Sequence, residues 1–287
     1  MIYSIQCSGQ MCNRIMWFVH ALATAIDCKS DITNFFGRDL RAFSDLHPEA
    51  LPEINVRCFN WKYLLPVDVL HGWLLNLPVF GQNYYLSRSP SRCARWREHG
   101  IRRPLLLWNW YFRNYDAVDR HREKIVDYLR VRDEFTVRPN KIIAVARKDA
   151  AVLVGVHIRR GDYKQACAQW YFDDSTYLQF MRDFQLSIQG SVKFILVSNE
   201  PIDVEFFIRS GVDVVDASGK AQEDIVTLSL CDYIMGPPST FSWWAAYYGG
   251  KPRLPLGKKD MKVAAEFFQA GAVYKMNPPK KDESGLT

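Results

Sequence analysis

The sequence predicts an α/β fold in which a parallel sheet is flanked by helices. Beyond about residue 150, short apolar runs alternate with segments of helical pattern. Several of these runs end in clusters of polar side chains, as buried parallel strands do at a ligand-binding edge. The chain is 287 residues long and 48% hydrophobic, which is enough for two lobes that each have a core.

The N-terminal part of the chain opens on a predicted strand at residues 2–7. The turn Ser8–Cys12 then leads into residues 13–26, which are apolar on nearly every face and predict a buried helix. Residues 30–120 are rich in Trp, Tyr, Arg and Pro and show no clean period, so we interpret them as helix and loop. A further helix is expected at 119–129.

The segment Val137-Arg138-Pro139-Asn140 breaks the helical pattern, and we place the boundary between the lobes there. The predicted lobes are residues 1–138 and 139–275, and residues 276–287 form a flexible polar tail. The second lobe alternates strands with helices. The strands are expected at 152–158, 192–198, 212–215 and 232–236, and the helices near 174–188, 201–209, 221–230 and 241–248.

Composition narrows the class of protein. The net charge of +6 is mild and comes without a dense Lys/Arg block, so we expect no nucleic-acid partner, while contact with an anionic membrane surface fits. The seven cysteines are scattered without a Cys-x-x-Cys pair, which favours a reduced, cytoplasmic protein. No stretch of about 18 apolar residues occurs, so the sequence predicts no membrane span.

The most informative segment is His157-Ile158-Arg159-Arg160-Gly161-Asp162, which follows the apolar run at residues 152–156. Arginine offers a rigid, permanently charged fork that matches phosphate oxygens. Two adjacent arginines at a strand end therefore suggest an anionic ligand that carries more than one charge. The alternative interpretation is a surface salt bridge at the end of a strand.

Two further strand ends carry polar clusters. Ser198-Asn199-Glu200 suits the edge of a base or a ribose, although a helix cap before Pro201 explains the same residues. After the strand at 232–236, two prolines precede Ser239 and Thr240, which open a helix whose unpaired N–H groups suit a phosphate. Ser239 also fits a plain N-cap, and the two roles are compatible.

Missing motifs restrict the reaction class. The chain has no P-loop, no Gly-x-Gly-x-x-Gly after a strand and no Asp-x-Asp metal motif. A diphosphate would then be neutralised by Arg159, Arg160 and the helix at Ser239 rather than by Mg²⁺. We therefore expect no metal ion and no other cofactor.

Three segments resemble, in order and spacing, the bacterial α-1,2-fucosyltransferases of glycosyltransferase family 11. They are the hexapeptide at 157–162, the strand ending in Ser198-Asn199-Glu200, and Asp224–Tyr248, which contains Ser239-Thr240-Phe241-Ser242-Trp243-Trp244-Ala245. This last run is highly specific to the family. The His-x-Arg-Arg-x-Asp pattern is shared with the wider group of α-1,2, α-1,6 and protein O-fucosyltransferases. The match covers about residues 150–250 and is looser at the N-terminus.

The resemblance implies a GT-B architecture, with two facing Rossmann-like lobes and the nucleotide site in the C-terminal lobe. It also implies an inverting, metal-independent transfer of L-fucose from GDP-fucose to a galactoside hydroxyl in an α-1,2 linkage. The acceptor implied is a galactose-containing glycan in surface polysaccharide or lipopolysaccharide synthesis. Such a protein is expected in the cytoplasm, with peripheral contact at the inner membrane.

The resemblance also assigns roles to residues. Arg159 would be the catalytic residue, which contacts the β-phosphate as the negative charge of the departing GDP develops. Arg160 and Asp162 would order its loop. The remaining assignments place the guanosine on His157, Ser198, Asn199 and Glu200, and the diphosphate on Ser239, Thr240, Phe241 and Ser242.

Two positions depart from the family pattern. The family usually has Gly-Asn-Gln near the N-terminus, whereas this chain has Cys12-Asn13-Arg14, so Asn13 enters the sugar site with changed neighbours. Asn199 stands where an acidic residue is common, which moves the expected guanine contact toward Glu200.

The acceptor is expected to bind against aromatic side chains, because sugars pack on aromatic faces. The candidate rings are Trp73, Tyr84, Tyr85, Trp108 and Trp110, for which core packing is the alternative. Two other functions stay open at this point. One is a transferase that uses another GDP-sugar, and the other is a non-catalytic nucleotide-sugar-binding protein.

Overall fold

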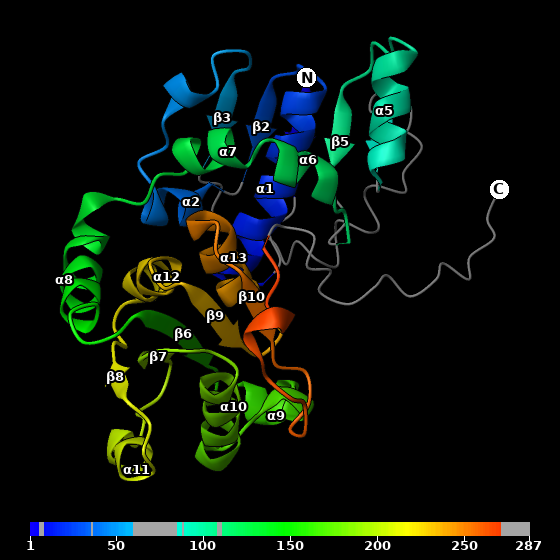
Figure 1. Ribbon diagram of the computed structural model, residues 1–287. Coiled ribbons are helices and arrows are strands. Elements are labelled where there is room, and N and C mark those ends of the chain that lie inside the picture. Colours follow the sequence, from blue (N-terminus) through cyan, green and yellow to red (C-terminus); the bar gives the residue numbers. More distant parts are fainter. Residues whose placement is uncertain (6–8, 36, 60–84, 88, 108–110, 271–287) are drawn as a thin grey trace. The chain divides into compact units, whose positions relative to one another are not determined.

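The computed structural model describes residues 1–5, 9–35, 37–59, 85–87, 89–107 and 111–270 (Figure 1). It divides into two compact units, Met1–Glu134 and Phe135–Thr287. The predicted tail at 276–287 lies outside the described residues. Within the part described, no helix combines the length and the apolar character that crossing a membrane requires.

The N-terminal unit is built on a five-stranded sheet with the order β3-β2-β1-β5-β4, in which every pair of neighbours is parallel. Its strands are β1 (Ile2–Ser4), β2 (Ile32–Asn34), β3 (Val56–Cys58), β4 (Tyr85–Ser87) and β5 (Leu105–Leu107). The interpretation of residues 30–120 as helix and loop was therefore wrong for four segments. Each of them is only three residues long, too short to show a period of two.

Helix α1 (Met11–Asp27) is the predicted buried helix, and its residues Ile15 to Ile26 are all buried. It contacts β1 and β2 and the helices α6 and α7. The predicted helix at 119–129 is divided at His121 into α6 (Tyr115–Arg120) and α7 (Arg122–Tyr128). His121 contacts Asp27 at the end of α1, with 2.7 Å between Nε2 and Oδ1. The other helices that the structure describes in this unit are α2 (Arg38–Phe43) and α5 (Pro90–Glu98), with 3-10 turns at Pro48–Ala50 and Asp133–Phe135. The boundary of the unit, after Glu134, lies within the second of these turns.

The C-terminal unit contains an all-parallel sheet with the order β10-β9-β6-β7-β8. Its strands are β6 (Val152–Ile158), β7 (Val192–Ser198), β8 (Val214–Asp216), β9 (Tyr233–Gly236) and β10 (Arg253–Pro255). The strands β6 and β7 have the predicted bounds and pair along their whole length, whereas β10 was not predicted. The strands β7 and β8 lie on one side of β6 in the sheet, and β9 and β10 lie on its other side. The order of strands therefore reverses between β6 and β9, and the carboxyl ends of these two strands flank the topological switch point.

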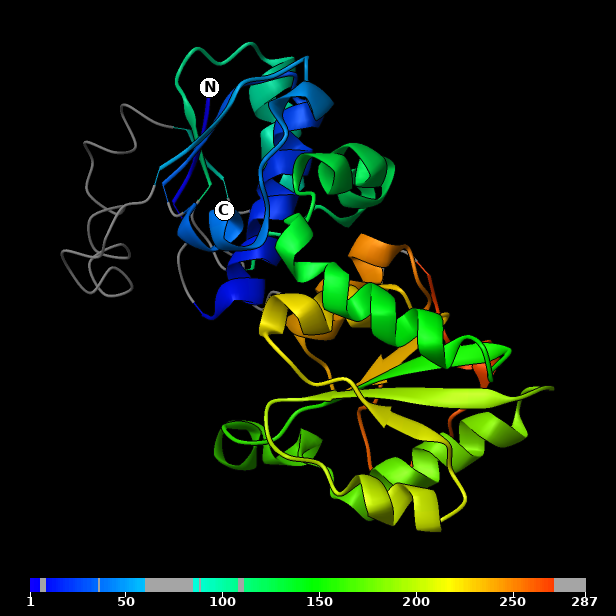
Figure 2. The ribbon, with the colours of Figure 1, turned by 90° about the vertical axis from the view of Figure 1, so that its left-hand side faces the viewer.

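Helices cover both faces of this sheet, with α10 and α11 on one face and α8, α12 and α13 on the other (Figure 2). They are α8 (Val137–Ala146), α9 (Tyr163–Ala166), α10 (Asp174–Leu186), α11 (Val204–Arg209), α12 (Ala221–Ser229) and α13 (Thr240–Gly249), with 3-10 turns at Ala168–Trp170 and Ala265–Phe267. The expectation that residues 137–140 break a helix was wrong. Pro139 lies in the first turn of α8, where a backbone N–H has no partner within the helix.

Two further contacts of the C-terminal unit involve α8 and β10. The helix α8 contacts α12, which assigns it to the C-terminal unit. The free edge of β10 carries an antiparallel bridge, in which Arg253 and Gln269 exchange backbone hydrogen bonds of 2.8 and 3.2 Å.

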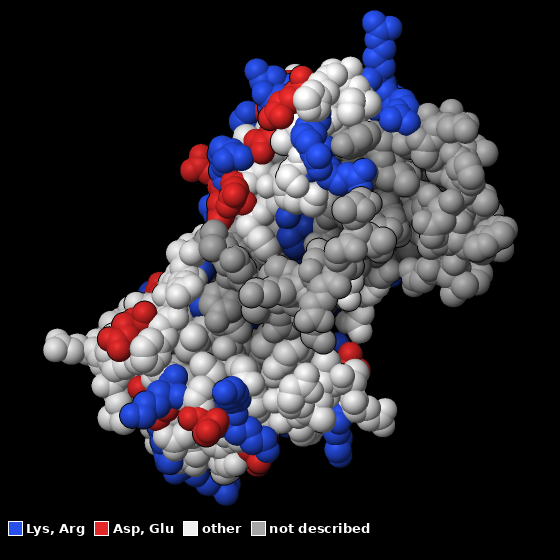
Figure 3. All heavy atoms as spheres, turned by 90° about the vertical axis from the view of Figure 1, so that its right-hand side faces the viewer, with Lys and Arg blue, Asp and Glu red and all other residues white. Residues whose placement is uncertain are grey.

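Charged side chains are mixed on the surface. On the face drawn in Figure 3, Lys and Arg side chains lie beside Asp and Glu side chains over the described residues. A basic block of the kind that binds nucleic acid is not seen among them.

Candidate functional site

Three polar loops meet at one edge of the C-terminal sheet. They follow β6, β7 and β9, which are neighbours in the sheet and parallel to one another. The prediction that these strand ends share an edge is therefore confirmed.

The loop after β6, residues 159–162, contains the two adjacent arginines and is called the arginine loop below. Arg159 is ion-paired with Asp162, with 2.8 Å between Nη2 and Oδ1, and its guanidinium carbon lies 5.4 Å from the ring centroid of Tyr163. Arg160 instead forms an ion pair with Asp174 on α10. The two adjacent forks therefore point to different partners, and both are mostly buried.

A turn at Gly161 connects this loop to the loop after β7. Gly161 has φ +58°, in the left-handed region that favours glycine. A Cβ atom there would lie 2.8 Å from Asn199 Nδ2 and 3.3 Å from Glu200 Oε1. The backbone N–H of Arg160 donates to Asn199 Oδ1 at 2.9 Å. Asn199 thus holds the arginine loop, a role that the sequence did not predict.

Ser198 ends β7 and is linked to a further loop. Its backbone N–H donates to Ser218 Oγ at 3.0 Å, and its own Oγ accepts from the backbone N–H of Glu200 at 3.1 Å. Arg138 on α8 holds the segment around Ser218 by donating to the carbonyls of Ala217 and Ser218 at 2.9 and 3.1 Å. The residues Ser218 and Arg138 had no motif around them and were missed.

Asp224 on α12 is a further residue that the sequence analysis did not single out. Its carboxylate accepts from the backbone N–H of Gly219 at 2.7 Å. Burial raises the pKa of this carboxyl to about 7, against the opposing effects of the Gly219 hydrogen bond and the charge of Arg138. The group therefore changes its charge near neutral pH beside the loop that supports Ser198.

The loop after β9 opens helix α13 as predicted. Ser239 caps the helix, since its Oγ accepts from the backbone N–H of Phe241 at 3.2 Å. The hydroxyl of Tyr163 donates to the Pro238 carbonyl at 3.2 Å, which joins this loop to the arginine loop. Thr240, the first residue of α13, and the cap together present the positive end of a ten-residue helix.

His157 lies beneath these loops and is 4% exposed. Its ring is 4.8 Å from the ring of Phe241, with 30° between the planes. Burial, together with the charges of Arg159 and Arg253, lowers the pKa of His157 to about 3. The imidazole is therefore neutral at physiological pH, and its Nδ1 has no hydrogen-bond partner among the described residues.

Ser242 differs from its predicted role as a direct donor to the diphosphate. It is fully buried, its hydroxyl donates to the Ser239 carbonyl at 3.4 Å, and it accepts from Arg253 Nε at 3.1 Å. The Ser242 hydroxyl thus already donates one hydrogen bond and accepts another within the protein. This geometry favours a role for Ser242 in holding the loop rather than in direct contact with a ligand.

Asn13 belongs to the N-terminal unit, where it lies in the first turn of α1. Its neighbour Arg14 forms an ion pair with Asp39 and donates to the Gly9 carbonyl at 2.7 Å, which holds the turn before the helix. Among the aromatic acceptor candidates, Trp73, Tyr84, Trp108 and Trp110 lie outside the described residues. The backbone of Tyr85 is in β4, and its side chain is not described.

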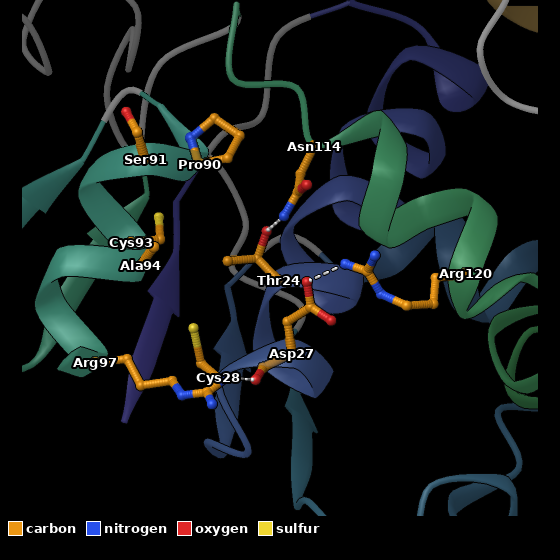
Figure 4. A pocket seen from close by; sticks show the side chains of 10 residues that line it. All are labelled: Thr24, Asp27, Cys28, Pro90, Ser91, Cys93, Ala94, Arg97, Asn114 and Arg120. Atoms are coloured by element: carbon orange, nitrogen blue, oxygen red, sulfur yellow. Dashed lines mark hydrogen bonds and ion pairs between the residues drawn. The ribbon is translucent and has the colours of Figure 1, made fainter.

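A pocket of about 440 Å³ is found in the N-terminal unit, between α1 and α5 (Figure 4). Thr24 and Asp27 line it from α1, and Asp27 is paired with Arg120 at 2.8 Å. None of the residues predicted for the site lines this pocket. The polar edge of the C-terminal sheet is the better candidate, because its side chains are suited to an anion.

The fold defines the broad class. The chain resembles a crystal structure of the fucosyltransferase NodZ from Bradyrhizobium, with a TM-score of 0.56, 13% identity and coverage of 90% of this chain and 96% of that one. It also resembles POFUT1 in complex with GDP, with a TM-score of 0.54, 11% identity and coverage of 91% and 98%. At these identities the likeness concerns the fold, which is that of fucosyltransferases with parallel α/β sheets.

The sequence then defines the family. Residues 81–278 match the model of Glycosyl transferase family 11. The chain belongs to this family. It is 32% identical over 211 residues to galactoside alpha-(1,2)-fucosyltransferase 1 of Homo sapiens, covering 71% of this chain and 52% of that protein. For the protein of the same name from Oryctolagus cuniculus the identity is 27% over 216 residues, with coverage of 71% and 51%. The match thus spans about half the length of these relatives.

Proposed function

We propose that the protein transfers L-fucose from GDP-fucose to a galactoside hydroxyl in an α-1,2 linkage, with inversion and without a metal ion. One observation carries this proposal. The Arg159 fork and the N-terminus of α13 lie on loops that Tyr163 joins, by its ring at 5.4 Å from Arg159 and its hydroxyl at 3.2 Å from the Pro238 carbonyl. A fork and a helix N-terminus on joined loops suit a diphosphate.

In this proposal the donor binds along the polar edge of the C-terminal sheet. Arg159 contacts the β-phosphate, and the cap at Ser239 to Phe241 receives the diphosphate. The guanosine is placed on His157, Ser198 and Glu200, while Asn199 orders the arginine loop. The neutral, buried imidazole of His157 can offer a hydrogen bond to a base without adding a charge. The names of structural relatives that were solved with GDP support this choice of nucleotide.

The proposed reaction is a direct displacement. An acceptor hydroxyl oxygen forms a bond to the anomeric carbon of fucose while the bond from that carbon to the β-phosphate oxygen breaks. The electron pair of the broken bond stays on GDP, and the hydroxyl proton passes to solvent or to a base of the enzyme. Arg159 stabilises the charge that develops on the leaving phosphate, and this stabilisation is stronger in the transition state than in the ground state.

The proposed acceptor is a galactose-containing glycan, which the names of the curated relatives support. We place the activity in surface polysaccharide or lipopolysaccharide synthesis, in the cytoplasm and in peripheral contact with the membrane. The GT-B arrangement of two facing lobes, with Asn13 contributing to the sugar site, is part of the same proposal. The mild net charge of +6 fits an anionic surface.

The test is an incubation of the protein with GDP-fucose and a panel of galactosides in EDTA. We expect release of GDP together with a new glycan, whose linkage NMR identifies as α-1,2 to galactose. Turnover only after addition of Mn²⁺ or Mg²⁺ would contradict the metal-free mechanism. Turnover with another GDP-sugar alone, or GDP binding with no turnover, would replace the proposal by one of the two alternatives.

A further inference from the structure

Arg253 is a charged residue inside the C-terminal unit that the proposed reaction has not used. It lies on β10 and is only 2% exposed, which is rare for arginine. Its Nε donates to Ser242 Oγ at 3.1 Å, and its Nη2 donates to the Pro237 carbonyl at 3.2 Å. The same guanidinium therefore contacts the residue that follows β9 and the first turn of α13.

Burial of the Arg253 guanidinium is energetically unfavourable by itself. A buried ion loses its hydration, and replacement by a well-packed apolar residue is often neutral or stabilising. Two hydrogen bonds of Arg253, to the Ser242 hydroxyl and to the Pro237 carbonyl, direct this buried cation to the loop beside the proposed donor site.

The charge lies beside the polar edge where the proposed donor binds. Arg253 contacts both ends of the loop Pro237–Ser242, which contains the cap residue Ser239. Its charge also reaches the end of β6, since it is one of the causes that lower the pKa of His157. Arg159 lies on the other loop of the site and faces solvent in part, with 19% of its side chain exposed.

We propose that Arg253 is a positioning residue for the nucleotide diphosphate, which holds the Pro237–Ser242 loop in its phosphate-binding form and adds a buried positive charge beneath it. This inference rests on the proposed function. Arg253 acts through Ser242 and Pro237 and does not itself touch the ligand. The contribution is greater for the diphosphate than for the base, because Arg253 contacts the Pro237–Ser242 loop directly and reaches the base contacts only through His157.

The experiment compares binding of guanosine and GDP by calorimetry to the whole protein and to three variants. Arg253→Lys keeps a charge but loses the planar fork, whereas Arg253→Gln and Arg253→Met remove the charge. GDP should bind at least about tenfold more weakly to the neutral variants and about threefold more weakly to Arg253→Lys, the scale expected for one partly screened charge. The affinity for guanosine should change by less than about twofold.

The control is Arg209→Gln, which changes an arginine on α11 whose side chain is 81% exposed, and it should bind both ligands as wild type does. Melting of each ligand-free variant reports on the fold. If the neutral variants do not fold, Arg253→Lys decides, and GDP binding equal to wild type would overturn the proposal. Equal losses for guanosine and GDP would show a general structural role and overturn it as well. Failure of the wild type to bind GDP would instead overturn the proposed function.

Discussion

The backbone N–H of Arg160 donates to the side chain of Asn199 at 2.9 Å, across the ends of two neighbouring strands. This hydrogen bond sets the loop that carries Arg159 against the loop after β7. The ion pair of Arg160 with Asp174 fixes the same loop from the side of α10. The two arginines therefore differ in position, since Arg160 is held by Asn199 and Asp174, whereas Arg159 pairs with Asp162 and is the residue that we propose to contact the ligand.

Replacement of Arg159 should impair turnover more than folding. We expect Arg159→Ala to lower kcat by roughly 10² to 10³, as loss of one preorganised donor typically does. Arg159→Lys should recover little, because an ammonium cannot reproduce the fork. The measurement is kcat with GDP-fucose and a galactoside, with thermal melting as the test of fold and Arg209→Ala as a control at an exposed position. A variant that melts like wild type and keeps most of its turnover would remove Arg159 from the catalytic role.

The nucleotide preference should be visible in thermal melting. GDP at a hundredfold excess over its Kd should stabilise the protein by about 2.7 kcal/mol, because it binds only the folded state. UDP and CMP should stabilise it weakly or not at all. Equal shifts with UDP would contradict the assignment of the guanosine to His157, Ser198 and Glu200.

Gly161 offers a test of the loop junction with a matched control. Gly161→Ala and Gly211→Ala both place a side chain at positive φ, +58° and +80°, so each should lose about 1–2 kcal/mol of stability. A Cβ atom at 161 would also meet Asn199 and Glu200, whereas one at 211 would meet nothing within 4 Å. Only Gly161→Ala should weaken GDP binding, measured by calorimetry. The same affinity in both variants would show that the junction does not shape the nucleotide site.

Asp224 should make stability depend on pH in a defined direction. Its pKa is raised to about 7 in the folded protein, above the ordinary value of 3.8, so the folded state binds the proton more tightly. The contribution of protonated Asp224 to the stability of the folded state is fully present below pH 3.8 and is lost as the pH rises to about 7. An asparagine side chain at this position cannot ionise, and Asp224→Asn should therefore gain about 2 kcal/mol relative to wild type between pH 5 and pH 8.

The difference in the free energy of unfolding between wild type and Asp224→Asn can be measured by urea unfolding of both proteins at pH 5 and at pH 8. The amide oxygen of the asparagine can still accept from Gly219, so the comparison isolates the charge. A stability difference that does not change with pH, or one that changes in the opposite direction, would contradict the raised pKa.

The sequence was most informative where apolar runs were long. β6 and β7 are seven-residue buried strands whose bounds and polar ends were both predicted. The strands β2 to β5 have three residues each and were missed, because pairing with distant partners rather than local pattern determines them. Arg253 was missed for a similar reason, since its contacts join β10 to residues 11 and 16 positions earlier.

The bridge between Arg253 and Gln269 also matters for how copies of the protein behave toward one another. An open sheet edge is a template on which another chain can add a strand, and proteins avoid aggregation by covering such edges. The segment at Gln269 occupies the backbone groups of Arg253 on that side of β10. A short stretch of described chain after β10 therefore covers part of the edge beside the Pro237–Ser242 loop, where we expect it to hinder strand addition by a neighbouring molecule.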